Sequence, residues 1–492
     1  MMVHLPILPV IIPLIAAPIC ALLHRGPLAW LIAALAMATS FATSLLILLE
    51  TSQGEVLHYA LGGWVAPYGI EYRFDPLNAL ILTLVSGIGT VMAPYALRSV
   101  MEEGQPGKHC QFYSMMLLCF AGLLGIVATN DVFNMYVFLE ISSLAMYALI
   151  AMGQRRRALT SAFEYLILGT IGATFFLIGI GLLYAATGTL NLSDLSTRIA
   201  SVADLRPLHT AFAFIIIGLS LKAALFPLHI WMTNAYAYAP SVISAFLSAT
   251  ATKVSLYLII RVIFGLFGYH FSFLEIPLGM FFMCCGVAAI IIASFAAIYR
   301  MDVKRLLAFS SVAQVGYIIL GIGLATETAL TGSIVHLVNH ALAKGALFLA
   351  VGCVIFRTGG CTLPYFHGLG RKMPWTMAAF ALSSLSLIGV PLTAGFISKW
   401  LLIQAMIESG AWFLVLVMIA GSALAIIYIG RVLEAAYFRP INRHTRHRSD
   451  VPLIMLIPLW TLVLANIYFG INTHWTLGVA EAAVDSLLSG GL

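Results

Sequence analysis

The sequence predicts an all-α polytopic membrane protein with about fourteen transmembrane helices and two inverted five-helix repeats. Hydrophobic residues occupy 61% of the 492 positions and charged residues only 9%, whereas a soluble chain carries about 25% charged residues. The mean hydropathy is +1.01, so too few polar residues remain to cover a water-soluble core. Two apolar runs are also interrupted by Gly and Pro at corresponding places. This composition excludes a soluble enzyme, a nucleic-acid-binding protein and a disordered scaffold.

The predicted helices follow apolar runs of about 20 residues, the length that crosses a bilayer. The first run has no Lys or Arg before it, which favours a spanning helix over a cleaved signal peptide. No soluble domain interrupts the runs, so we expect a single membrane domain over residues 1–492. The predicted helices cover residues 3–23, 28–49, 74–97, 110–129, 131–152, 158–187, 209–230, 239–267, 275–299, 303–325, 328–356, 374–403, 409–438 and 451–470.

Lys and Arg are distributed unevenly between the connections. Sixteen lie in odd-numbered connections and three in even-numbered ones, with none at the termini. By the positive-inside rule, the odd connections are cytoplasmic and both termini are external. One missed helix would scramble this alternation, so it also supports the helix count. The sixteen are Arg25, Arg98, Lys108, Arg155, Arg156, Arg157, Arg300, Lys304, Arg305, Arg357, Arg371, Lys372, Arg439, Arg443, Arg446 and Arg448, and the three are Arg73, Arg198 and Arg206.

The seven cysteines lie mostly within apolar runs and form no CxxC pair or four-ligand set. Buried thiols that act as small hydrophobic residues are the better interpretation. The sequence contains no Walker A motif. We therefore predict no cofactor and no metal site.

Six cations remain near or within the membrane: Lys222, Lys253, Arg261, Lys344, Lys399 and Arg431. We expect Arg261 and Arg431 toward helix ends or at the rim of the bundle, where long side chains reach the interface. The four lysines lie deeper in their apolar runs. Each costs about 2.5–3.5 kcal/mol on insertion scales, so together they cost about 10–14 kcal/mol. This penalty is comparable with the net stability of a whole protein, and it favours a functional role over structural pairing alone.

Glu140, in the fifth predicted helix, is the acidic counterpart of these lysines. A carboxylate at mid-membrane needs a cation or a proton, and lysines on other helices are the available partners. Glu164 lies closer to a cytoplasmic end, where Arg155, Arg156 and Arg157 precede it. For Glu164, a surface ion pair and a role in a proton relay are equally open.

His336, His340 and Lys344 are spaced by four residues in the eleventh predicted helix. This spacing places them on one helix face, in a stripe about 12 Å long. The HxxxH pattern lacks the Glu of a metalloprotease helix, because Leu337 occupies that position. Either histidine alone would fit a core residue satisfied by its neighbours. Three titratable groups on one intramembrane face instead favour a proton wire.

Two predicted helices contain their own breaks. The seventh carries Lys222, Pro227 and His229, and the twelfth carries Pro391 and Lys399. Proline removes a backbone hydrogen bond, and freed carbonyls at membrane depth are tolerated only against protein or water. Gly/Pro-interrupted helices in corresponding positions are typical of an inverted-repeat transporter. We therefore predict that helices 4–8 and 9–13 form the repeats, with boundaries at 1–109 for helices 1–3, 110–267 and 275–438 for the repeats, and 451–492 for the last helix and tail.

Several motifs in this order resemble the antiporter-like family shared by respiratory complex I, membrane-bound hydrogenases and multisubunit Mrp cation/proton antiporters. The resemblance is specific from about residue 125 to 405. It rests on DVFNMYVFLE (131–140), KAALFPLHIW (222–231), AYAYAPS (235–241), TKV (252–254), DVKRLLAFSS (302–311), the helix with His336, His340 and Lys344, and the segment that ends at Lys399.

The resemblance implies a fourteen-helix fold with broken helices 7 and 12. It also implies an intramembrane proton path that starts at Glu140 and Lys222, crosses Lys253, and ends at Lys399. The residues implied in proton translocation are Glu140, Lys222, His229, Lys253, His336, His340, Lys344 and Lys399. Two departures from the family pattern occur: Thr233 replaces a frequent Pro, and Glu164 replaces a frequent Lys.

Within the family, the chain is most similar to the D-type member of Mrp antiporters. This implies a proton-translocating subunit of a multisubunit Na⁺ or K⁺/proton antiporter, a transporter subunit rather than an enzyme, in the bacterial cytoplasmic (inner) membrane. Its expected partners are the other membrane subunits, protons, Na⁺ or K⁺, and the lipid bilayer. The alternative is a proton-pumping subunit of a complex I-like NADH-quinone oxidoreductase or membrane-bound hydrogenase. A membrane-embedded enzyme using His336 and His340, and a purely structural subunit, are weaker alternatives.

Overall fold

The structure is a computed structural model that describes residues 2–52, 54–105, 107–441 and 449–488. Within these residues the chain is helical almost throughout, which confirms the predicted all-α class. Arg443, Arg446 and Arg448, which count toward the predicted orientation, lie outside the described residues.

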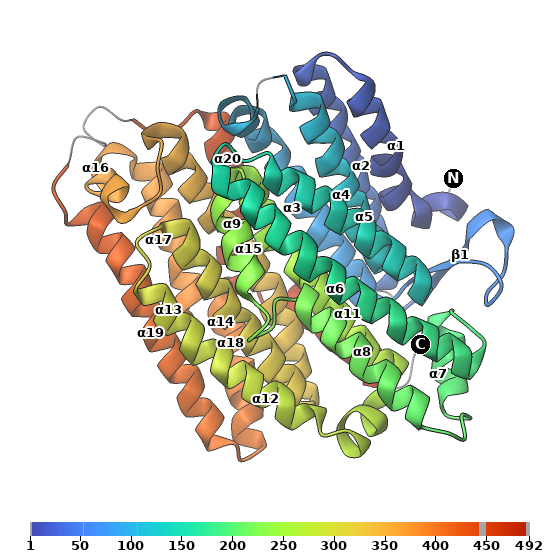
Figure 1. Cartoon of the computed structure of the whole chain (residues 1–492). Helices are drawn as coiled ribbons and strands as arrows, with labels where there is room; N and C mark the ends of the chain where they lie inside the picture. Colours follow the sequence, from blue (N-terminus) through green and yellow to red (C-terminus); the bar gives the residue numbers. More distant parts are fainter. Residues whose placement is uncertain (1, 53, 106, 442–448, 489–492) are drawn as a thin grey trace.

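The helices of the first half are α1 (Leu8–Leu22), α2 (Gly26–Thr51), α3 (Pro76–Glu103), α4 (His109–Ala128), α5 (Val132–Ala151), α6 (Arg156–Thr187), α7 (Leu192–Ile199), α8 (Arg206–Lys222), α9 (Ile230–Tyr238), α10 (Ser241–Ala249) and α11 (Ala251–Ile260). Those of the second half are α12 (Leu278–Ala288), α13 (Ser294–Ile298), α14 (Val303–Leu324), α15 (Glu327–Thr358), α16 (Leu369–Lys372), α17 (Pro374–Ile388), α18 (Ala394–Glu408), α19 (Trp412–Tyr437), α20 (Leu453–Ile471) and α21 (His474–Leu488). Helix α15 packs against α3, α10, α14, α17, α18 and α20, and it therefore lies at the centre of the bundle in Figure 1.

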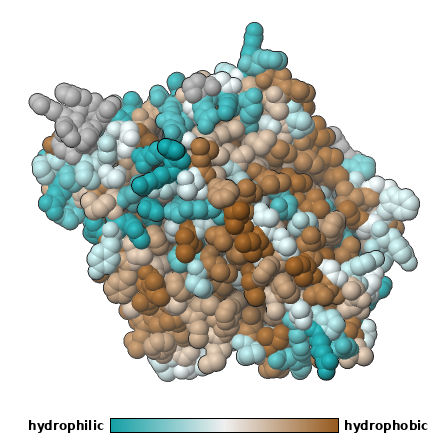
Figure 2. All heavy atoms as spheres, in the orientation of Figure 1, coloured by the Kyte–Doolittle hydropathy of each residue, from teal (hydrophilic) through white to brown (hydrophobic). Residues whose placement is uncertain are grey.

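Twelve helices in the described part of the chain are long and apolar enough to cross a membrane. The seventh and twelfth predicted helices are not among them, because each is divided into two shorter helices. Helix α8 has 17 residues and α17 has 15. The exact total of fourteen therefore stays a prediction. In Figure 2, apolar atoms dominate the middle of the surface, while hydrophilic residues gather at the upper left and again at the lower right. The chain is a multi-pass membrane protein.

The structure confirms both predicted helix breaks. Helix α8 ends at Lys222 and α9 begins at Ile230, with Pro227 between them. Helix α17 ends at Ile388 and α18 begins at Ala394, with Pro391 between them. Each break exposes backbone groups that a continuous helix would have paired internally. Protein side chains donate to carbonyls at both breaks: Trp231 to the carbonyl of Leu221, and Lys399 to those of Leu387 and Ile388.

The two halves share a local pattern that agrees with the predicted repeats. Asp131 is the N-cap of α5 and forms a β-bridge with Asn191, which follows α6. Asp302 is the N-cap of α14 and forms a β-bridge with Thr362, which follows α15. In each predicted repeat, therefore, the start of the second helix (α5 or α14) lies against the segment that follows the third helix (α6 or α15). The boundaries of the repeats stay a prediction.

Two local features depart from a purely helical bundle. Strands β1 (Leu57–Ala60) and β2 (Glu71–Phe74) form an antiparallel hairpin in the second connection. The eighth predicted helix bends at Thr250, where φ is −123° and ψ is −58°, between α10 and α11. It then continues as a π-helical segment, η3 (Arg261–Leu266).

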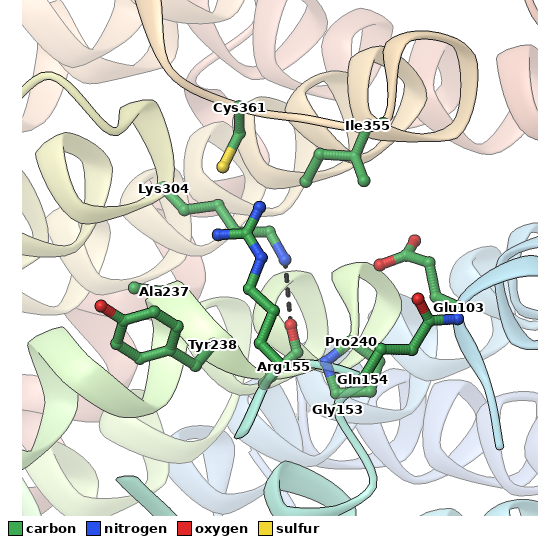
Figure 3. Close-up of a pocket in the computed structure, with 12 residues that line it drawn as sticks. Glu103, Gly153, Gln154, Arg155, Ala237, Tyr238, Pro240, Lys304, Ile355 and Cys361 are labelled. Atoms are coloured by element: carbon green, nitrogen blue, oxygen red, sulfur yellow. Dashed lines mark hydrogen bonds between the residues drawn. The ribbon is translucent and has the colours of Figure 1, made fainter. Parts of the chain in front are cut away.

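Residues from several odd-numbered connections meet around one cavity of about 100 Å³. Figure 3 shows Glu103, Arg155, Tyr238, Lys304 and Cys361 grouped there, each from a different connection or its edge. This grouping agrees with the alternation of connections between the two sides. The assignment of one side to the cytoplasm, and of both termini to the exterior, stays a prediction.

Candidate functional site

Glu140 and Lys222 form an ion pair between α5 and α8. The Nζ atom of Lys222 lies 3.5 Å from Oε1 of Glu140. The same Nζ donates a 2.8 Å hydrogen bond to the hydroxyl of Ser143, one turn along α5. Lys222 is buried, whereas the Glu140 side chain is 21% exposed. The cationic partner expected for Glu140 is therefore present.

Lys253, on α11, follows Lys222 in the interior of the bundle. A cavity of about 20 Å³ lies between Lys222 and the α11 residues Ala251 and Ser255, which is room for one water molecule. Lys253 is fully buried, and its Nζ donates to the carbonyl of Ser248, just before the bend that separates α10 from α11. The bend thus places a backbone acceptor beside the Lys253 ammonium.

Lys344 and His340 lie on α15, within electrostatic range of Lys253. Lys344 is fully buried and donates to the carbonyl of Leu307, at 2.8 Å, and to the hydroxyl of Ser310. His340 is also buried, and neither of its ring nitrogens has a hydrogen-bond partner among the described residues. A buried polar group without a protein partner can be satisfied by a water molecule where there is room for one.

His336 connects His340 to α18. The two imidazole rings are nearly parallel, with centroids 6.1 Å apart. His336 Nδ1 lies 2.8 Å from the hydroxyl of Ser398, and Nε2 lies 2.9 Å from Oε1 of Gln314. The predicted stripe of two histidines and a lysine is therefore present in the core, and His336 contacts Ser398, the residue that precedes Lys399.

Lys399 lies on α18, and its ammonium reaches back to the break between α17 and α18. Its Nζ donates to the carbonyls of Leu387 and Ile388, at 3.1 and 2.9 Å, and to the hydroxyl of Ser422, at 3.0 Å. The ammonium also lies 4.8 Å from the centre of the Tyr317 ring. The last carbonyls of α17 are free because the break at Pro391 ends that helix. The predicted break thus provides acceptors for the predicted lysine.

The structure places seven of the predicted residues in one row through the protein interior, and we call this row the lysine row. Its members, in order from α5 to α18, are Glu140, Lys222, Lys253, Lys344, His340, His336 and Lys399. Their roles in proton translocation stay predictions.

Three other charged or titratable residues lie outside the lysine row. His229 is half-buried and stacks on Phe226 in the helix break, with centroids 5.2 Å apart. Glu164 accepts a 2.7 Å hydrogen bond from Asn234, so the contact seen for it is with an amide rather than with the preceding arginines. Arg431 lies at the rim, as expected, near the sulfur of Met301.

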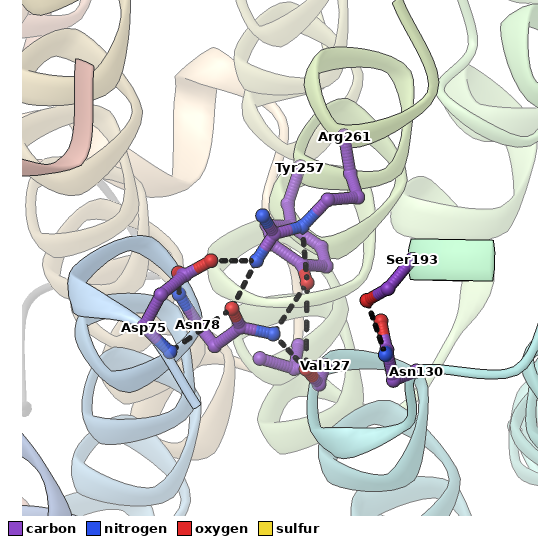
Figure 4. A network of polar contacts seen from close by, with 7 residues as sticks. All are labelled: Asp75, Asn78, Val127, Asn130, Ser193, Tyr257 and Arg261. Atoms are coloured by element: carbon purple, nitrogen blue, oxygen red, sulfur yellow. Dashed lines mark hydrogen bonds and ion pairs between the residues drawn. The ribbon is translucent and has the colours of Figure 1, made fainter. Parts of the chain in front are cut away.

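The prediction for Arg261 is partly wrong. Arg261 lies near a helix end, but it is only 3% exposed and does not reach the rim. Its Nη2 forms a 2.6 Å ion pair with Asp75, the N-cap of α3. Asn78 and Tyr257 complete this polar network, which Figure 4 shows from close by. The network was missed because its partners lie 186 residues apart in the sequence.

Sequence reasoning also missed the neutral residues that hold the lysine row. Gln314 is a buried amide in the apolar run of α14, and it binds His336. Such an isolated amide is a signal that the sequence already contains. Tyr317, one turn further along α14, lies against both His336 and Lys399.

Broken helices around a buried row of lysines, histidines and one glutamate define a multi-pass membrane protein with a polar path across its interior. Residues 129–425 match the family described as NADH:quinone oxidoreductase/Mrp antiporter, TM. The chain belongs to this family, which confirms the resemblance seen in its motifs.

Relatives of both kinds of complex match almost the whole chain. The N subunit of NADH-quinone oxidoreductase from Desulforudis audaxviator (strain MP104C) is 42% identical over 96% of each chain. The D subunit of the Na⁺/H⁺ antiporter from Bacillus subtilis (strain 168) is 28% identical over 98% of this chain and 97% of its own. The fold is similar to a chain in the Mrp complex from Dietzia sp. DQ12-45-1b, with a TM-score of 0.90 and 24% identity over 99% of this chain and 97% of that one.

Proposed function

We propose that the chain is the proton-translocating subunit of a multisubunit Na⁺ or K⁺/proton antiporter. One observation carries the proposal: the lysine row connects the Glu140–Lys222 pair on α5 and α8 to Lys399 on α18 through buried titratable side chains. Burying four lysines costs about 10–14 kcal/mol on insertion scales. A structural pairing would supply each with a carboxylate, whereas among the described residues only Lys222 of the four has an ion pair within 4 Å.

The chemistry of the lysine row suits stepwise proton transfer. Glu140 would attract a proton to Lys222, and the small cavity beside Lys222 has room for a water that carries it toward α11. His340 and His336 would pass the proton along α15, because a neutral imidazole accepts at one nitrogen and donates at the other. Lys399 would release it at the break between α17 and α18.

The subunit would act within a complex in the bacterial cytoplasmic membrane, with both termini outside. Two relatives support an assembly: one is called a subunit of an antiporter, and the structural neighbour is called an Mrp complex. The distribution of Lys and Arg supports the orientation. Exposed apolar faces on α2, α6, α12 and α19 leave room for lipid and for further subunits.

A second candidate function is proton pumping in a complex I-like oxidoreductase. The 42% identity to a chain called an N subunit of NADH-quinone oxidoreductase favours it. Both candidates use the same lysine row and differ in what drives the proton. Identification of the subunits that co-purify with the chain in mild detergent would separate them, because redox subunits would accompany the chain only in the second case. A chain purified alone with full transport activity would contradict both.

The test of the proposed function is Lys399→Ala in the assembled complex. We expect loss of cation-dependent proton movement in inverted membrane vesicles, followed with a pH-sensitive dye. Lys108→Ala, which removes an exposed lysine outside the lysine row, is the matched control and should transport like the unchanged protein. An intact Lys399→Ala complex that transports at the unchanged rate would show that the relay assignment is wrong.

A further inference from the structure

Three buried residues follow one face of the eighth spanning helix. Lys253, Tyr257 and Arg261 are spaced by four residues and are at most 3% exposed. A step of four residues keeps side chains on one face and advances about 6 Å, so that Arg261 lies about 12 Å from Lys253 along the helix. This face leads away from the lysine row, toward the side that carries β1 and β2.

A polar cavity lies at the end of this direction. It has a volume of about 490 Å³, and its lining includes His58, Glu71, Arg73, Asn191 and Asp194. These residues belong to even-numbered connections, which the distribution of Lys and Arg assigns to the exterior. Arg73 lines this cavity, and Asp75, which pairs with Arg261, follows it in the sequence after a single residue at the end of β2. The direct line from Lys253 to this cavity therefore runs past Tyr257 and Arg261, and we call it the short route, in contrast to the long route along α15.

The short route is occupied by charge. Arg261 forms a buried ion pair with Asp75, and both side chains are at most 4% exposed. Arg73 is buried beside them and interacts electrostatically with both, and also with Glu71 on the side of the cavity. One guanidinium group thus pairs with Asp75 and a second lies within electrostatic range of it, so a proton on the short route would have to pass fixed positive charge.

The uncharged members of the network close the route further. Asn78 donates to the carbonyl of Val127, at 2.6 Å, and to the hydroxyl of Tyr257, at 2.8 Å. The capping box of Asp75 and Asn78 fixes both at the start of α3. Figure 4 shows the four side chains Asp75, Asn78, Tyr257 and Arg261 directed toward one another between their helices.

We propose that the Asp75–Arg261 pair, together with Arg73, is an electrostatic plug that closes the direct route between Lys253 and the external cavity. The plug rests on the proposed function, since it matters only if Lys253 carries a proton. A guanidinium group keeps its proton under all physiological conditions, so Arg261 repels a migrating proton instead of relaying it. Fixed arginines exclude protons and cations in the same way in pores. The plug forces a proton on Lys253 to travel along α15 to Lys399.

The experiment measures passive proton leak through the assembled complex in liposomes. The liposomes contain the pH dye pyranine and a choline medium without Na⁺ or K⁺, and a thiocyanate diffusion potential drives proton entry. Removing one charge at about 12 Å, with an effective dielectric constant near 20, should speed the leak about tenfold. We expect this increase in Arg261→Gln, in which Arg73 remains within electrostatic range of Asp75. Arg261→Lys keeps the charge and should leak like the unchanged complex.

Two further variants keep the test decisive. Arg73→Gln removes the second guanidinium group but leaves the Asp75–Arg261 pair, so it tests the plug even if Arg261→Gln does not assemble. It should also raise the leak. The double variant Arg261→Gln/Lys399→Ala should still leak, because the short route does not include Lys399.

Intact Arg261→Gln and Arg73→Gln complexes that leak no faster than Arg261→Lys would overturn the plug. A variant Arg261→Gln that loses transport without leaking would overturn it as well, since the pair would then belong to the relay. Unchanged transport in Lys399→Ala alone refutes the relay but not the plug. The two failures are therefore distinguishable.

Discussion

Replacing Glu140 tests the energetic link between the carboxylate and Lys222. At a distance of 3.5 Å between Lys222 Nζ and Glu140 Oε1, two unit charges in an effective dielectric constant near 20 attract by about 4.7 kcal/mol. Glu140→Gln removes this attraction, but the Lys222 ammonium can still donate a hydrogen bond to the amide oxygen of the new side chain. A hydrogen bond to a charged group is worth about 2 kcal/mol, which offsets part of the loss. The remaining loss of about 2.7 kcal/mol corresponds to about 100-fold in the population of charged Lys222.

Glu140→Asp gives an intermediate perturbation. The side chain is shorter by one methylene, which lengthens the separation of 3.5 Å to about 5 Å and lowers the attraction to about 3.3 kcal/mol. Loading of Lys222 should then fall about tenfold. The two variants thus predict an ordered series, in which the unchanged complex is fastest, Glu140→Asp slower and Glu140→Gln slowest.

The assay is the initial rate of proton translocation in inverted vesicles, normalised to the amount of assembled complex. The matched control is Glu434→Gln, the same substitution in an exposed ion pair with Arg439 on the surface of α19. We expect it to keep the unchanged rate, since exposed pairs contribute little. Equal rates for Glu140→Asp and Glu140→Gln would refute the distance argument, and an unchanged rate in both would refute the role of Glu140.

Three further predictions concern other parts of the fold. Gly389 has φ +93°, and an added Cβ would lie 2.9 Å from Lys399 Cδ. Gly389→Ala should therefore lower the yield of assembled complex, measured by size-exclusion chromatography. A normal yield with normal activity would contradict this prediction. His340→Leu removes the unpartnered ring from the lysine row and should abolish translocation while leaving the thermal melting temperature within a few degrees; persistent translocation would remove His340 from the relay. Burial alone would raise the pKa of Glu71, but hydrogen bonds from Asn130, His58 and Asn191 outweigh it and lower the pKa. The stabilising contribution of the ionised carboxylate is therefore present above about pH 4.5 and is lost as the pH falls through the lowered pKa. Glu71→Gln should therefore melt at a lower temperature than the unchanged protein at pH 7, with a smaller difference below pH 4, and a difference that grows on acidification would contradict this.

Much of the fold could be predicted because membrane helices obey strong local rules. Length, hydropathy and proline position located the breaks at Pro227 and Pro391, since a proline inside an apolar run has few alternatives. The row of titratable residues could also be predicted, because a charge that costs several kcal/mol at mid-membrane stands out in the sequence.

The features that sequence reasoning missed depend on contacts between distant segments. Arg261 resembles a rim residue until Asp75, before the first turn of α3, is known to lie against it. The bend at Thr250 has no proline or glycine to announce it. The hairpin of β1 and β2 lies in a connection, where hydropathy carries little information about structure.

The partners of the lysines divide them into two kinds. Lys222 faces a carboxylate, so loss of its proton would leave Glu140 with an uncompensated negative charge. Lys253 and Lys399 face backbone carbonyls next to a helix bend or break, and loss of their protons leaves only neutral acceptors behind. The bends and breaks therefore do more than interrupt the helices. They allow an ammonium to be held without a carboxylate. Under the proposed function, the carboxylate-bound Lys222 would capture a proton and the carbonyl-bound lysines would pass it on.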